Sequence, residues 1–267
     1  MTPTATIAVI GGSGLYDLLD DARDVHVDTP YGPPSDTVTV AEVAGRSVAF
    51  LPRHGRDHRH PPHLIPYRAN LWALRSLGVR QILAPCAVGG LRSDLGPGTF
   101  VLPDQLIDRT SGREHTFVES GAVHVNFADP YCPAGRAAVA ATAAATGVAL
   151  APDGTMVVID GPRFSTRAES RWYAAAGGTV INMTGAPEAA LARELALCYT
   201  AVALVTDHDA GVDGERGVTQ EEVFRVFKDN IERLRALLLA VIADLPDDRA
   251  CPCPAALYGM QPAYRLP

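Results

Sequence analysis

The first candidate for chemistry in this chain is Arg53-His54, which directly follows the apolar run at 47–51, where a strand would end. A planar guanidinium offers parallel N–H donors that suit a phosphate. The histidines of the same segment also have spacing that would allow a metal site, but no cysteine or paired carboxylate completes a ligand set and the arginines between them oppose a cation. We therefore favour a phosphate pocket here over a solvated basic loop or a metal site; the histidines concerned are His54, His58, His60 and His63.

The second candidate is Asp207-His208-Asp209, which ends the apolar run at 199–206. Carboxylates at i and i+2 of an extended chain point to the same side. Like charges held close raise one pKa, which leaves a carboxylic acid that can donate a proton at neutral pH. A glycosidase pair fits poorly, because such carboxylates usually come from separate strands. A merely structural role, with both aspartates capping a turn, stays open.

Two further segments follow apolar runs. Gly12-Ser13-Gly14 is either an anion cradle or a tight turn. It fits neither the dinucleotide motif nor the hydrolase elbow, because Asp17 and Leu15 stand where glycines belong. Cys86 could act as a nucleophile, but a buried small side chain is the favoured interpretation because no histidine–carboxylate pair is adjacent.

Composition narrows the class of protein. Hydrophobic residues make up 47% and charged residues 20%, which excludes global disorder. The net charge of −7 has the wrong sign for a nucleic-acid clamp, so an anionic substrate needs a local basic pocket. Lys228 is the only lysine, which excludes a Walker phosphate loop and disfavours Schiff-base chemistry. Without a leader pattern or a membrane-length apolar run, we expect a cytoplasmic protein that does not bind membranes, with its five cysteines mostly reduced.

Strand and helix patterns alternate along the chain. This alternation predicts an α/β fold with a parallel or mixed central sheet and helices on both faces. We expect one domain over 1–267, with a core at about 7–245 and a proline-rich tail at 246–267 that shows no packing pattern. The predicted strands are 7–10, 37–43, 47–51, 81–84, 155–159, 179–182 and 199–206; the predicted helices are 67–77, 137–145, 167–176, 187–197 and about 219–245.

Five ordered motifs together resemble one known family. The chain is similar to the methylthioadenosine phosphorylase branch of the trimeric purine nucleoside phosphorylases, from about Ile7 to Leu245. The motifs are Gly11-Gly12-Ser13-Gly14-Leu15, Arg53-His54-Gly55, Tyr67-Arg68-Ala69-Asn70-Leu71-Trp72-Ala73-Leu74, Gly161-Pro162-Arg163-Phe164-Ser165-Thr166-Arg167-Ala168-Glu169-Ser170 and Ile181-Asn182-Met183-Thr184.

The resemblance implies the single-domain nucleoside phosphorylase fold, a homotrimer with sites near subunit boundaries, and phosphorolysis of a purine nucleoside without metal or organic cofactor; inorganic phosphate is the co-substrate. Matching positions assign roles. Phosphate would be bound by Ser13, Arg53, His54, Thr184 and the Cys86–Ala87 segment. Phe164 would stack near the base, and Asp207 and Asp209 would recognise the purine, with Asp207 the catalytic acid near N7. Met183 would pack on the ribose, and His124 would lie near the 5′ substituent.

The residues at the purine positions bear on the substrate. Asp209 suits the exocyclic amino group of adenine as an acceptor, which favours 6-aminopurine nucleosides. The resemblance further implies 5′-methylthioadenosine as the substrate, with release of adenine and 5-methylthioribose 1-phosphate. The alternatives are a broader purine nucleoside phosphorylase acting on adenosine or inosine, and a non-catalytic nucleoside- or phosphate-binding module. Cys86 stands where the family more often has a hydroxyl, which weakens one expected phosphate contact. Cys251-Pro252-Cys253 resembles cysteine pairs of some heat-loving relatives, but we expect free thiols here.

Overall fold

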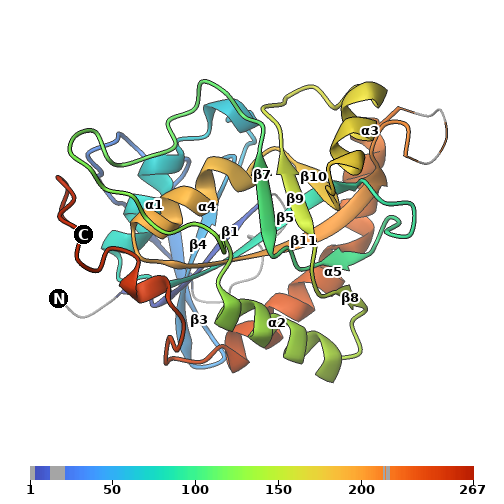
Figure 1. Ribbon diagram of the computed structural model, residues 1–267. Coiled ribbons are helices and arrows are strands. Elements are labelled where there is room, and N and C mark those ends of the chain that lie inside the picture. Colours follow the sequence, from blue (N-terminus) through green and yellow to red (C-terminus); the bar gives the residue numbers. More distant parts are fainter. Residues whose placement is uncertain (1–3, 13–21, 213, 215–216) are drawn as a thin grey trace.

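The computed structural model describes residues 4–12, 22–212, 214 and 217–267 (Figure 1). Ser13 and Leu15 lie outside the described residues. The helices are α1 (Tyr67–Ser76), α2 (Pro133–Ala145), α3 (Arg167–Ala175), α4 (Gly185–Glu194) and α5 (Gln220–Asp244), with short 3₁₀ turns η1 (Pro62–Leu64) and η2 (Cys253–Ala255). The strands are β1 (Ile7–Gly11), β2 (Arg23–Val25), β3 (Val38–Val43), β4 (Arg46–Pro52), β5 (Gln81–Gly90), β6 (Phe100–Val101), β7 (Gln105–Asp108), β8 (Leu150–Ala151), β9 (Thr155–Val158), β10 (Val180–Asn182) and β11 (Cys198–His208).

The strands of the described residues form one mixed sheet. Its main path runs β2-β3-β4-β1-β5-β10-β9-β7, and β11 branches from β5 to pair with β6. Strands β4, β1, β5 and β11 are mutually parallel, whereas β10 runs antiparallel to β5. The carboxyl ends of the four parallel strands therefore meet at one edge of the sheet.

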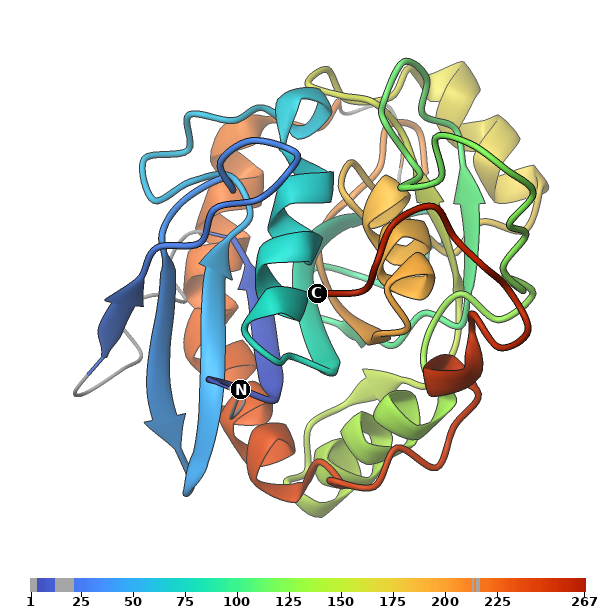
Figure 2. The same cartoon turned by 90° about the vertical axis from the view of Figure 1, so that its left-hand side faces the viewer.

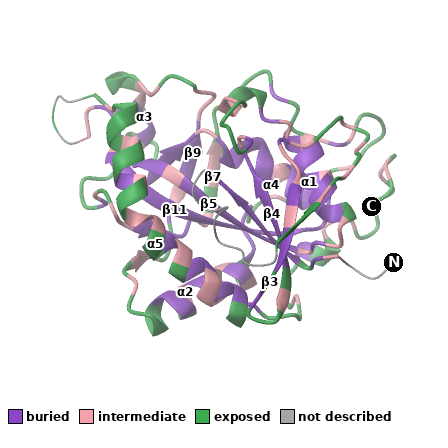
Figure 3. Ribbon diagram, turned by 180° about the vertical axis from the view of Figure 1, so that it is seen from behind, coloured by how far each residue is buried: buried purple, intermediate pink, exposed green. Residues whose placement is uncertain are grey.

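Helices cover both faces of this sheet, as the sequence predicts. Ala8 and Ile10 of β1 pack with α1 and α4 on one face, and Ile7 and Val9 pack with α2 and α5 on the other (Figures 1 and 2). Alternate side chains of a strand point to opposite faces, so a strand buried on both sides is apolar throughout. Figure 3 shows the buried strands between helices whose outer faces are exposed.

Local signals explain where several elements begin and end. Ala44 and Gly45 both have positive φ in the turn of the β3–β4 hairpin, the conformation that a tight two-residue hairpin turn requires. Thr166 opens α3 with a capping box completed by Glu169, and the Thr219 side chain accepts the Glu222 backbone N–H at the start of α5.

Two sequence-based expectations were wrong. The strand predicted at 81–84 continues to Gly90, because β11 pairs with β5 almost along its whole length and β10 pairs with its end. The tail also packs: the Tyr264 ring lies 6.2 Å from Trp72 and 5.8 Å from Phe117, and its hydroxyl donates to the Glu194 carbonyl. A single aromatic residue in a proline-rich segment has no periodicity, so the sequence pattern did not predict this packing.

None of the helices in the described part of the chain has the length and apolar character to cross a membrane.

Candidate active site

A cavity of about 420 Å³ opens where the parallel strands end. Its walls come from the ends of β4, β5, β10 and β11, from Gly12 after β1, and from the first turns of α5. This volume lies within the roughly 300–1,000 Å³ typical of small-molecule sites. The carboxyl edge of an α/β sheet is also where such folds place ligands.

The cavity brings together most of the residues singled out from the sequence. Those that line it are Arg53, His54, Cys86, Ala87, Phe164, Met183, Thr184, Asp207 and Asp209. Ser13 lies outside the described residues. His124 does not line the cavity of its own chain; it is exposed on the segment between β7 and α2.

Arg53 is held by a residue that the sequence reasoning missed. Its Nε and Nη2 donate to the two carboxylate oxygens of Glu188 at 2.8 and 2.9 Å, and its Nη groups also donate to the carbonyls of Pro85 and Ile10. Arg53 is 2% exposed and Glu188 is 0% exposed. Burial alone would lower the pKa of Arg53, but the Glu188 charge and hydrogen bonds raise it, so the guanidinium stays ionised. The Tyr199 hydroxyl donates to Glu188 as well.

The expectation that the Arg53 fork clamps phosphate was wrong in its geometry. Four of the five guanidinium N–H groups are used in these bonds, and the planar fork faces Glu188. One N–H on Nη1 is left over for a ligand. Arg53 thus offers a single charged donor whose position is determined by the buried carboxylate.

His54 adds no positive charge at neutral pH. Burial lowers its pKa to about 4, and the Arg53 charge acts in the same direction. Its Nδ1 lies 2.9 Å from the His60 carbonyl, which can only accept, so Nδ1 carries the proton and Nε2 is an acceptor. Among the described residues, the histidines of this loop do not converge into a metal-ligand group.

The part of the cavity wall formed by Arg53, His54 and Asn182 therefore offers hydrogen-bond donors and little net positive charge. The Nδ2 of Asn182 is buried without a partner among the described residues and lines the cavity beside Thr184. An unsatisfied buried amide costs about 1–3 kcal/mol, which a bound anion would recover. Asn182 is a second residue whose role the sequence reasoning missed, although it stands within a quoted motif. Of the local basic pocket expected from the net charge, the described lining contains the ionised Arg53 beside a neutral His54.

The two aspartates lie together in the wall of the same cavity, as the i, i+2 spacing predicts. Both side chains lie over Gly89, where an added Cβ would come within 3.1 Å of Asp207 Oδ1 and 3.2 Å of Asp209 Cβ. Burial raises the pKa of Asp207 to about 7, opposed by a hydrogen bond from Thr206 and assisted by the Asp209 charge. The Ser170 hydroxyl of α3 donates to Asp209 Oδ2 at 2.5 Å. The pair thus contains one group that holds a proton near neutral pH and one oriented acceptor.

Replacing Thr206 by valine is expected to raise the pKa of Asp207. The Thr206 hydroxyl donates to Asp207 Oδ2 at 2.8 Å and so stabilises the ionised carboxylate. Removing it favours the protonated acid, and we expect the high-pH limb of kcat/KM to move up by about 0.5–1 pH unit. Thr200→Val, on the same strand but outside the cavity, is the matched control. If the high-pH limb of kcat/KM does not move in Thr206→Val, Asp207 is not the group that sets it.

The remaining walls are largely apolar. Phe164 and Met183 line one side, and Val223, Phe224 and Phe227 of α5 line another. Burial raises the pKa of Cys86 to about 11, so this side chain is a neutral thiol at the cavity wall and not an activated nucleophile.

Comparison with known proteins shows the family of this chain. The family model described as "Phosphorylase superfamily" matches residues 6–243, and the chain belongs to this superfamily. It is 59% identical to a purine nucleoside phosphorylase of Streptomyces coelicolor, covering 98% of both chains. It is 56% identical to an S-methyl-5'-thioadenosine phosphorylase of Mycolicibacterium smegmatis, covering 98% of this chain and 99% of the relative.

Solved structures agree with these sequence matches. A methylthioadenosine phosphorylase from an antarctic soil metagenomic library matches with a TM-score of 0.90 and 41% identity, covering 97% of this chain and 93% of the other. Methylthioadenosine phosphorylase from Schistosoma mansoni in complex with adenine matches with a TM-score of 0.85 and 37% identity, covering 90% and 91%. The predicted nucleoside phosphorylase fold, with its mixed sheet and helices on both faces, is confirmed.

Proposed function

We propose that this chain is a pentosyltransferase that cleaves 5′-methylthioadenosine with phosphate, giving adenine and 5-methylthioribose 1-phosphate. The observation that carries the proposal is the cavity itself, which is lined both by a protonatable Asp207 and by unused donors of Arg53 and Asn182. The names of its relatives agree with this reaction.

The chemistry requires both a proton donor and an anion site in the cavity. Cleavage of the N-glycosidic bond develops positive charge on the ribose and negative charge on the purine. Asp207 would give its proton to N7 of the leaving base, an effect of about 10²–10⁴-fold for general acid catalysis. Phosphate oxygen would attack the anomeric carbon on the opposite side and end as the 1-phosphate. The anion also stabilises the cationic sugar electrostatically.

The other residues of the site are assigned to the phosphate, the base, the ribose and the 5′ substituent. We assign phosphate binding to Ser13, Arg53, His54, Cys86, Ala87 and Thr184, with Asn182 added. Phe164 would stack on the base, Asp209 would accept from the 6-amino group through Oδ1, and Met183 would pack on the ribose. Because His124 lies outside the cavity of its own chain, a role near the 5′ substituent requires another copy of the chain in a homotrimer.

The apolar wall of α5 favours methylthioadenosine over adenosine. Val223, Phe224 and Phe227 give a thioether an apolar surface and offer a 5′-hydroxyl no hydrogen bond; Gln220 is the polar lining residue of this helix. The experiment is base release from methylthioadenosine, adenosine and inosine, each with and without phosphate. We expect phosphate-dependent cleavage with methylthioadenosine preferred.

A broader purine nucleoside phosphorylase is the second candidate, favoured by the name of the Streptomyces coelicolor relative. Inosine cleaved more efficiently than methylthioadenosine would establish it in place of our proposal. Binding without any phosphate-dependent cleavage would instead indicate the non-catalytic module.

Replacing Cys86 by serine is expected to lower KM for phosphate about 3–10-fold. A hydroxyl is a stronger donor than the neutral thiol, and a good hydrogen bond contributes about 0.5–1.5 kcal/mol. Cys86→Ala is the matched control, because it removes the thiol without adding a donor. An equal KM in both variants would take position 86 out of the phosphate site.

We also propose that residues 1–267 form one nucleoside phosphorylase domain, with core 7–245 and tail 246–267, and that the protein is a cytoplasmic homotrimer. Shared core contacts across the sheet and the packing of Tyr264 onto α1 residue Trp72 support the single domain. Light scattering of the purified chain tests the trimer.

A further inference from the structure

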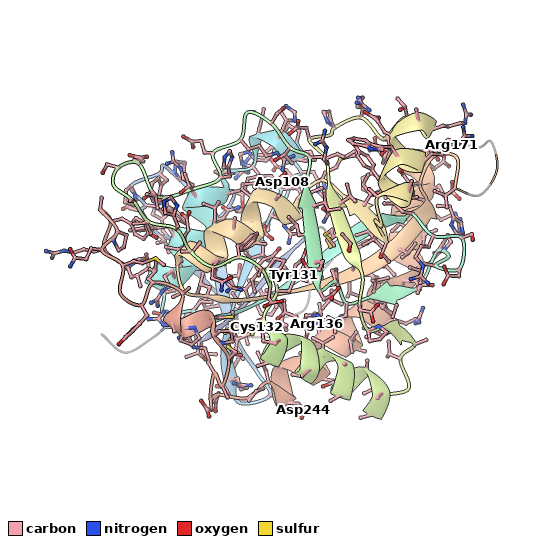
Figure 4. All side chains as sticks on the ribbon, viewed as in Figure 1. Asp108, Tyr131, Cys132, Arg136, Arg171 and Asp244 are labelled. Atoms are coloured by element: carbon pink, nitrogen blue, oxygen red, sulfur yellow. The ribbon has the colours of Figure 1, made fainter. Side chains whose placement is uncertain are left out.

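Four cysteines from three separate parts of the chain converge at one place outside the cavity. Cys132 is the N-cap of α2, Cys198 is the first residue of β11, and Cys251 and Cys253 belong to the C-terminal segment. All four sulfur atoms lie within 4.8 Å of one another, and Cys198 and Cys251 are 3.5 Å apart. Figure 4 shows Cys132 at the start of α2, beside the C-terminal turn. We call this group the four-cysteine cluster.

The dimensions of the four-cysteine cluster match a tetrahedral metal site. A Zn–S distance of about 2.3 Å places the sulfurs of such a site roughly 3.8 Å apart. The four thiols form no disulfide, and each sulfur lies within 4.8 Å of all three others, as four ligands of one ion must. Four sulfur ligands select zinc among the common divalent cations. Cys132, Cys198 and Cys253 are buried, and Cys251 is half-buried, which leaves an entry path.

The surroundings favour thiolates. The Cys132 sulfur accepts the backbone N–H of Gly135 at 3.4 Å, and it lies at the positive N-terminal end of α2. Arg249 stands two residues before Cys251, and its Nη1 donates to the carbonyl of Ala196, two residues before Cys198. A Zn(Cys)₄ group carries a net charge of −2, so the backbone hydrogen bond to the Cys132 sulfur and the positive end of α2 both stabilise it.

We propose that Cys132, Cys198, Cys251 and Cys253 bind one structural zinc ion. Zn²⁺ forms four Zn–S bonds, and the four thiols release their protons to solvent, with no change of oxidation state. The ion joins the C-terminal segment to the first residue of β11 and to the first turn of α2. This departs from the expectation that the chain binds no metal, because that expectation came from a resemblance and the cluster exists only in the folded chain.

Metal and thiol content test the proposal directly. The protein is purified without chelator or metal-affinity chromatography, and zinc is measured by inductively coupled plasma mass spectrometry. We expect one zinc per chain, and all five cysteines titratable in denaturant with EDTA. A single titratable thiol would reveal two disulfides and overturn the proposal, as would failure of the reduced protein to take up zinc.

Variants locate the metal. Cys251→Ser is expected to lose stoichiometric zinc, whereas Cys86→Ser, which changes the cysteine outside the cluster, retains it. Cys253→Ser is the second cluster variant. Retention of zinc by both cluster variants would overturn the assignment.

If the cysteine variants fail to fold, the unaltered chain still tests the proposal. Replacing zinc by Co²⁺ is expected to produce the visible bands of tetrahedral thiolate coordination, and metal removal to lower Tm by more than about 5 °C. A spectrum of octahedral Co²⁺, or an unchanged Tm after removal of bound zinc, contradicts a structural four-sulfur site.

Discussion

Replacing Glu188 by glutamine is expected to lower the free energy of unfolding by about 3–5 kcal/mol. The variant leaves the Arg53 guanidinium charged at 2% exposure and without its carboxylate partner. Glutamine keeps the shape of the side chain, so the loss reports the charge and not a cavity. Thermal or urea unfolding in phosphate-free buffer measures the effect.

Phosphate should recover part of that loss. With Glu188 neutral, an anion in the cavity becomes the partner of Arg53, and ligand binding raises stability by RT ln(1 + [L]/Kd). We expect the increase of Tm with phosphate concentration to be larger in Glu188→Gln than in the unaltered chain.

Glu194→Gln is the matched control on the same helix. Glu194 is also buried, but it accepts from the Thr116 hydroxyl and the Phe117 backbone N–H and pairs with no arginine in the described contacts. We expect a loss of about 1–3 kcal/mol and an unchanged response to phosphate. Equal phosphate responses in both variants would show that Arg53 does not face the anion.

Replacing Asp207 by asparagine is expected to lower kcat/KM for methylthioadenosine by about 10²–10⁴-fold. Asparagine has the shape of aspartic acid but cannot transfer a proton to the leaving purine. Steady-state kinetics with saturating phosphate measure the change. Asp94→Asn removes an exposed carboxylate paired with Arg92, and its turnover should stay normal. Near-normal turnover of Asp207→Asn would remove Asp207 from the acid role.

The pH dependence of stability shows whether Asp207→Asn loses activity through its missing proton or through misfolding. Burial raises the pKa of Asp207 from 3.8 to about 7, so between these values the folded chain holds a proton that the unfolded chain has released. The corresponding stability is present below about pH 4 and is lost as pH rises through 7. Asp207→Asn has no such dependence. Its stability relative to the unaltered chain should therefore increase from pH 4 to pH 8.

Sequence reasoning succeeded where a local pattern has one structural solution. The apolar runs at 7–10 and 199–206 and the helix predicted at about 219–245 each correspond to an element that the structure contains. The i, i+2 spacing of Asp207 and Asp209 placed both carboxylates on one side. Five ordered motifs sufficed for the family, which the match over residues 6–243 confirms.

The predictions from the sequence were wrong where the extent or packing of a segment depends on residues distant in the chain. The end of β5 was placed six residues early because Pro85 and the glycines that follow have low strand propensity, while pairing with β11 and β10 extends the strand to Gly90. The tail looked unpatterned because its contacts, such as those of Tyr264, come from residues that are distant in sequence.

The sequence by itself determined the order of elements, the edge of the sheet where polar side chains gather, and the identity of most residues around the cavity. These follow from hydrophobic period and glycine placement, which act over a few residues. Only the tertiary structure decided the charge states. Glu188 meets Arg53 across 135 residues, and four cysteines meet from three segments. Ion pairing and pKa depend on burial and on which strands and helices lie side by side, and both arise only when the whole sheet is assembled.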